Sequence, residues 1–148
     1  MSTLYRWWAA IVFLAVLVQV GLAGYGAFHA VDKADDDGQV TKKTVEDGFD
    51  LHAGIGYLLV IAVLLLLLLA FLSARDRSAG SEDRRVRWSG IALGLLVLQV
   101  LLAWLGSAVA GLGFLHPINA LAIFAVTGML AHRAWRGAMG VRPATRTT

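Results

Sequence analysis

The sequence contains no cysteine and few charged residues. The lack of cysteine excludes disulfide bonds, thiolate-bound iron–sulfur clusters and thiol nucleophiles. Charged residues make up 16% of the chain, against about a quarter in an ordinary soluble domain, and 58% of the residues are hydrophobic. The charged residues fall into four blocks, and long runs without any Lys, Arg, Asp or Glu separate these blocks. This composition indicates an integral membrane protein.

Three uncharged runs predict four membrane-spanning helices. A helix needs roughly 20 mostly apolar residues to cross about 30 Å of hydrocarbon. The runs 7–28 and 51–74 each suit one crossing. The third run, 88–131, has 44 residues and suits two crossings joined by a tight turn. The first run also exceeds the 7–15 apolar residues typical of a cleaved signal peptide, so we expect it to span the membrane.

The middle of the third run has turn-forming residues. Gly111 and Gly113 permit positive φ, and Pro117 is tolerated in the first turn of a helix. We therefore expect one domain, 1–148, with an all-α fold: an up-down-up-down four-helix membrane bundle. Its helices are predicted at 7–28, 51–74, 88–111 and 116–136, with a longer, more mobile loop over 29–50.

The distribution of charge predicts how the bundle is oriented. Ten of the 13 Lys and Arg residues lie at the end that holds both termini, and only Lys33, Lys42 and Lys43 lie at the other. Seven of the ten acidic residues lie in 29–50. Because Lys and Arg near a span resist translocation, we expect a cell-membrane protein with both termini cytoplasmic. The basic pI of 9.7 is then a consequence of topology, and no nucleic acid partner is expected.

A short internal repeat suggests that the bundle consists of two duplicated helical hairpins. Residues 18–28, VQVGLAGYGAF, resemble residues 98–108, LQVLLAWLGSA. Each of these helices carries a glutamine in mid-span, Gln19 or Gln99. The helix that follows opens with a Leu-His pair ending in His52 or His116.

These repeated polar residues are the candidate site. Polar groups inside a bilayer are costly and usually face the interior of a bundle, where they serve a function. The second and fourth helices of an up-down-up-down bundle lie on a diagonal. One iron held by two imidazoles at about 2.0 Å places the Cα atoms roughly 12–13 Å apart, which matches a bundle diagonal of roughly 11–14 Å. We therefore predict a haem b site with iron ligands His52 and His116.

Other residues near the predicted ligands receive secondary roles. Glycines, among them Gly24 and Gly56, would leave room for the macrocycle. Gln19 and Gln99 would bind each other or the ligand, or would only join helices. His29 is an alternative to His52 as a ligand. An alternative for both histidines is an ordinary interfacial or helix-capping role.

Two further polar features of the sequence are not expected to bind a metal or a cofactor. His132 lies among arginines at the other end, where we expect it to be solvated. The run Asp35-Asp36-Asp37-Gly38 lacks the spacing and final Glu of a calcium-binding EF-hand loop, so we interpret it as a solvated surface.

The Gln-bearing helix followed by a helix that opens with histidine resembles one half of the haem A synthase family. The chain also resembles small uncharacterised four-helix membrane proteins with a Leu-His-Pro before the last helix. The first resemblance implies a four-helix bundle in which His52 and His116 hold haem. The chain departs from that family because it lacks a second bundle and an identifiable acidic residue for the chemistry.

The sequence is compatible with three functions. The favoured one is a membrane-embedded b-type haem protein for electron transfer or haem handling, with a quinone or a redox partner subunit as its expected partner. The alternative is a cofactor-free structural or accessory subunit. A solute transporter is disfavoured because no discontinuous helix or paired intramembrane charge is evident.

Overall fold

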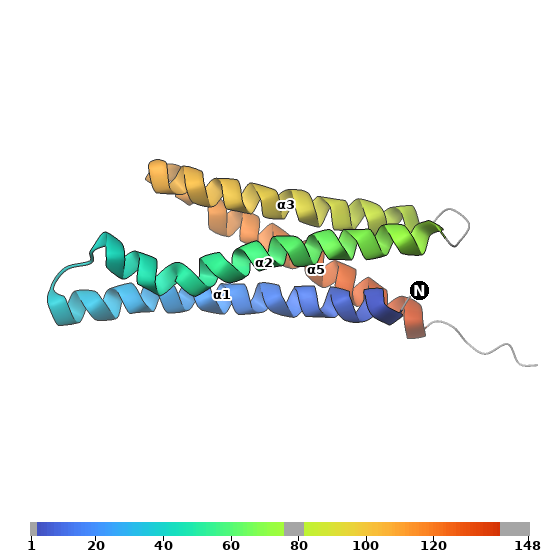
Figure 1. Ribbon diagram of the computed structural model, residues 1–148, viewed down its shortest axis with the longest axis horizontal. Helices are drawn as coiled ribbons and strands as arrows, with labels where there is room; N and C mark the ends of the chain where they lie inside the picture. The colour runs from blue at the N-terminus through green and yellow to red at the C-terminus, as the bar shows by residue number, and fades with distance from the viewer. Residues whose placement is uncertain (1–2, 76–81, 140–148) are drawn as a thin grey trace, which may run out of the picture.

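The computed structural model describes residues 3–75 and 82–139, and these are almost entirely helical (Figure 1). No strand occurs in the described ranges. The elements, in order, are α1 (Thr3–Asp37), α2 (Lys42–Arg75), α3 (Glu82–Ala108), α4 (Ala110–Gly113) and α5 (Leu115–Met139). Four of these helices are long and apolar enough to cross a membrane. The predicted all-α four-helix bundle is confirmed.

The four long helices form a closed ring. Helix α1 packs against α2 and α5, and α3 packs against the same two neighbours. Within the described helices, no backbone packing joins α1 to α3 or α2 to α5, so these two pairs are the diagonals of the bundle. The start of α1 and the end of α5 lie at one end of the bundle, and the α1–α2 connection lies at the other (Figure 1). We call them the basic end, which carries Arg6 and Arg133, and the acidic end, which carries Asp32 and Asp50.

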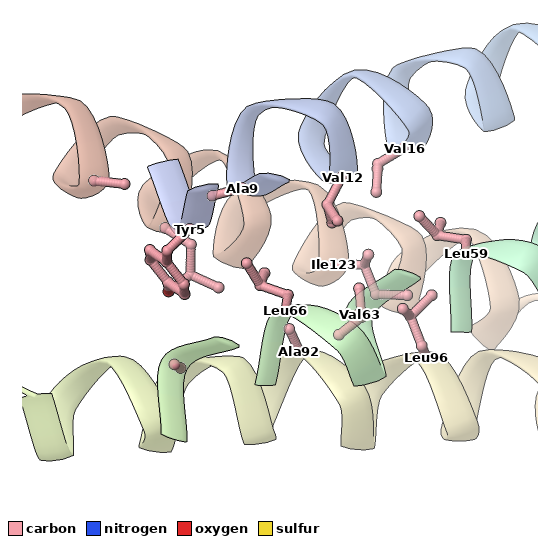
Figure 2. Packing of buried hydrophobic residues seen from close by; sticks show 13 residues of the cluster. Tyr5, Ala9, Val12, Val16, Leu59, Val63, Leu66, Ala92, Leu96 and Ile123 are labelled. Carbon is pink, nitrogen blue, oxygen red and sulfur yellow. The ribbon is translucent and has the colours of Figure 1, made fainter. Parts of the chain in front are cut away.

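A narrow apolar core runs along the bundle from the basic end. In α1 it uses one residue per turn, from Tyr5 through Ala9 and Val12 to Val16, because a 3.6-residue period returns these positions to one face (Figure 2). Leu66 of α2 is fully buried against this face. The remaining core residues come from α2, α3 and α5: Leu59, Val63, Ala70, Ala92, Leu96, Ile123, Leu130 and Ala134.

Outside this core the helices expose large apolar side chains. Leu14 is 56% exposed and Leu64 is 53% exposed, although both lie in the middle of spanning segments. Such a surface is unfavourable in water but suits the hydrocarbon of a bilayer. A multi-pass membrane protein accounts for both observations.

The prediction of a long loop over residues 29–50 is wrong. Residues 29–37 belong to α1 and residues 42–50 belong to α2, so only 38–41 connect the two helices. Pairs one helical turn apart stabilise these ends: Lys33 with Asp36, Lys42 with Glu46, and Lys43 with Asp47. The highly charged residues of segment 29–50 therefore lie on helical extensions outside the hydrocarbon.

The predicted tight turn between the last two spans is confirmed, but its backbone geometry differs from the prediction. Neither Gly111 nor Gly113 has positive φ, and in the described chain Gly38 alone does. Glycine is needed here because α3 and the turn approach closely: a Cβ on Gly106 would lie 2.7 Å from the Cα of Gly113. Pro117 lies in the first turn of α5, as predicted.

Candidate functional site

His52 and His116 meet in the interior of the bundle. They lie on α2 and α5, the diagonal pair, as the up-down-up-down topology predicted. Their ring centroids are 6.2 Å apart, with an angle of 61° between the ring planes. Both residues are half-buried. The structure therefore brings together the two residues that the sequence selected as ligands.

Each imidazole is held by a main-chain carbonyl of the neighbouring helix. The Nδ1 of His52 lies 3.2 Å from the carbonyl oxygen of Gln19, and the Nδ1 of His116 lies 3.1 Å from that of Gln99. Because a carbonyl only accepts hydrogen bonds, each Nδ1 must donate and carry the proton. The lone pair is then on Nε2, and no hydrogen bond from the described residues engages either Nε2. Metal-ligating histidines are commonly oriented by such a bond.

The two rings have the separation that a shared metal ion requires. With metal–nitrogen bonds of about 2.0–2.1 Å, the centroids of two imidazoles on opposite sides of one ion are roughly 6.3–6.5 Å apart. The observed 6.2 Å is close to this range. No cluster of three or more His, Cys, Asp or Glu that could hold a metal occurs among the described residues. Two imidazoles therefore suit an ion that brings its other ligands with it, such as the iron of a porphyrin.

Gln19 and Gln99 lie beside the histidines but do not bind each other. The side-chain Nε2 of Gln19 donates to the carbonyl oxygen of His52 at 3.0 Å. A Cβ on Gly56 would lie 2.9 Å from this Nε2, so Gly56 lets the amide reach the backbone of α2. Gly56 therefore positions Gln19, which is a different role from the predicted one of making room for a macrocycle.

The second hairpin holds its glutamine in another way. Asn119 is buried one turn after His116, and its Nδ2 donates to the Oε1 of Gln99 at 2.7 Å and to the carbonyl oxygen of Leu95 at 2.9 Å. Sequence reasoning gave Asn119 no role. Its spacing of three residues from His116 on one helical face was the available signal.

The apolar core cluster does not extend through the histidine layer. The core cluster ends at Val16, Leu59, Leu96 and Ile123, before the histidine layer is reached. One turn farther toward the acidic end, Ala23 is half-buried and Ala103 is exposed. A Cβ on Gly24 would meet nothing within 4 Å. Small residues therefore occur on the acidic side of the site. Two large side chains lie there as well: Leu102 is buried, and the ring of Phe49 lies edge to face with that of His52, with centroids 6.0 Å apart.

Three sequence-based details are wrong. His52 does not begin its helix, because α2 starts ten residues earlier at Lys42. The glutamines do not lie deeper than the histidines, since each histidine contacts the glutamine backbone directly. The outer glycines do not all make room: Gly26 lies against Gly48 and Phe49 in the α1–α2 contact.

The other two histidines lie outside the site. His29 stacks on Tyr25, with ring centroids 6.0 Å apart, and packs beside Gly48. The structure does not bring it into contact with His116. His132 is exposed near the basic end of α5, as expected.

The histidine layer lies nearer the acidic end of the membrane-spanning region. Gln99 follows Arg87 by 12 residues, which corresponds to about 18 Å of helix. The hydrocarbon is about 30 Å thick, so the layer lies beyond its midplane. Asp50, which is exposed, precedes His52 by two residues. The site is therefore close to water on one side of the membrane.

Comparisons with known proteins identify no relative. No protein-family model, curated protein or solved structure matches the chain. The resemblance to half of a haem A synthase therefore stays a prediction, and the case for function depends on the geometry of the site.

Proposed function

We propose that this protein is a membrane-embedded b-type haem protein in which the Nε2 atoms of His52 and His116 would hold the haem iron. The observation that carries the proposal is the histidine pair itself. Two imidazoles from diagonal helices are 6.2 Å apart, and each has its Nδ1 held by the equivalent glutamine carbonyl. Packing alone would not require both hairpins to orient their histidine in the same way.

The residues of the chain would bind and orient the cofactor. The carbonyls of Gln19 and Gln99 fix the histidine tautomers, and the bonds made by Gln19 and Asn119 fix the layer in which these carbonyls lie. Haem b would supply a one-electron couple, and its potential would depend on the two axial ligands and their hydrogen bonds.

The position of the site favours a function with a partner. A single haem on one side of the midplane leaves most of the membrane thickness between it and the basic end. Electron transfer across the bilayer would then need a quinone or a redox partner subunit, and haem handling would need a protein that delivers or receives haem. We therefore propose an accessory role in electron transfer or haem handling.

Haemin titration tests the proposal. The purified full chain in a neutral detergent should bind haemin at one equivalent, with the sharp visible bands of a low-spin complex after reduction. A variant with both His52 and His116 replaced by alanine is the control. If the wild type and this variant give the same featureless haemin spectrum, haem binding is refuted. A folded wild type that takes up no haem would favour the cofactor-free accessory subunit.

We also propose a cell-membrane location with the basic end on the cytoplasmic side, because the arginines gather there. The chain lacks cysteine, so single cysteines can report the side of each end. Cysteine at Gln39, in the exposed α1–α2 connection, should react with an impermeant maleimide in intact cells. Cysteine at Ser78, which lies outside the described residues, should react only after the membrane is opened. The opposite pattern would reverse the orientation.

A further inference from the structure

Arginine side chains at the basic end lie over aromatic rings. The Cζ of Arg6 is 4.8 Å from the ring centroid of Trp135, and the Cζ of Arg133 is 5.9 Å from that of Trp88. Trp7 meets Trp135 edge to face, with centroids 5.0 Å apart. Stacking on a ring face restrains a guanidinium and leaves its in-plane N–H groups available as donors. We call Arg6, Trp7 and Trp135 the Arg6 site, which joins α1 to α5.

Arg6 lacks a counter-ion among the described side chains. Its Nε is buried and makes no hydrogen bond. The ion pairs found in the described chain all involve lysines of the acidic end, at the far side of the bundle. A buried charged donor without an acceptor is costly. The Nη atoms of Arg6 are not among the buried unpartnered atoms, so an anion at that edge would neutralise the guanidinium charge, while Nε stays buried.

The surroundings of Arg6 indicate where this anion comes from. Tryptophans gather at the headgroup level of membranes, and Trp7 is 53% exposed on a helix that spans the bilayer. Phosphate is a good partner because its oxygens match the planar fork of arginine. We propose that the Arg6 site binds the phosphate of an anionic phospholipid.

Lipid competition followed by native mass spectrometry tests this proposal. The full chain in a neutral detergent is mixed with equal amounts of phosphatidylglycerol and phosphatidylcholine with identical acyl chains. The wild type should retain phosphatidylglycerol over phosphatidylcholine by about fivefold, the factor expected for one basic residue near an anionic headgroup. Arg6→Gln should remove this preference. Arg6→Lys, which keeps the charge but loses the planar fork, should keep only part of it.

Arg84→Gln is the matched control, because Arg84 is an exposed arginine at the same end. It should change the preference less than twofold. A wild type that shows no preference for phosphatidylglycerol would overturn the proposal. Equal losses of that preference in Arg6→Gln and Arg84→Gln would also overturn it, because they indicate only a diffuse attraction between the basic end and anionic lipid. Displacement of the lipid by inorganic phosphate at equal concentration would also overturn it, in favour of a free-anion site. Circular dichroism shows whether each variant is folded. If Arg6→Gln does not fold, the lipid preference of Arg6→Lys is the result that tests the proposal.

Discussion

Replacing either His52 or His116 with alanine is expected to abolish the low-spin haem spectrum. Each variant retains one axial imidazole, so bound iron should become high-spin. Loss of an outer-shell partner costs about 10- to 100-fold in metal affinity, so loss of a ligand should weaken haem binding by at least about 100-fold. Absorption spectra of the reduced variants, with haemin titrations, measure both effects.

The remaining histidines supply the controls. His132→Ala and His29→Ala should leave the spectrum unchanged, because neither residue belongs to the pair. Added imidazole should restore the low-spin spectrum in His52→Ala if the cavity persists. A low-spin spectrum that survives in both single variants would place the ligands elsewhere, and its loss in His29→Ala alone would make His29 the ligand.

Gly26→Ala is expected to destabilise the first hairpin. A Cβ at this position would lie 2.8 Å from the ring of Phe49 and 2.9 Å from the carbonyl oxygen of Gly48. The backbone of α2 cannot move away without shifting the hairpin, so overpacking should cost about 1–3 kcal/mol of unfolding free energy. Phe49 also contacts His52 edge to face, with centroids 6.0 Å apart, so haem affinity should fall too. Denaturation monitored by circular dichroism measures the stability.

Gly24→Ala is the matched control on the same helix. A Cβ there would meet nothing within 4 Å, and alanine favours a helix over glycine by up to about 1 kcal/mol. This variant should therefore be as stable as the wild type or slightly more stable. Equal destabilisation by both substitutions would show that the close contact at Gly26 does not set the hairpin packing.

The spans and the histidine pair could be predicted because they depend on simple patterns. Uncharged runs longer than a membrane is thick leave few alternatives to spanning helices. Four consecutive antiparallel spans in an up-down-up-down bundle then place the second and fourth helices on a diagonal, which brings His52 towards His116.

The register within each hairpin could not be predicted. The sequence suggested that Gln19 lies deeper than His52, whereas the packing of Gly26 against Gly48 sets the two side by side. This contact joins residues 22 positions apart, and no local periodicity reports it. Gly56 was misinterpreted for the same reason, since its neighbour Gln19 belongs to another helix.

The charged segment 29–50 was misinterpreted for a different reason. Its composition resembles a loop, but Lys42 and Lys43 precede Glu46 and Asp47 by four residues and form ion pairs on a helix surface. The helical spacing of opposite charges was the available signal. Packing of α1 against α2 stabilises this helical extension beyond what such exposed pairs provide.

Electron paramagnetic resonance of the ferric, haem-loaded wild type tests the proposed function most directly, because the spin state reports the axial ligands themselves. With His52 and His116 both on the iron, we expect a low-spin signal typical of two imidazoles, present at one equivalent per chain. A high-spin signal from bound haem in the folded wild type would contradict ligation by both histidines.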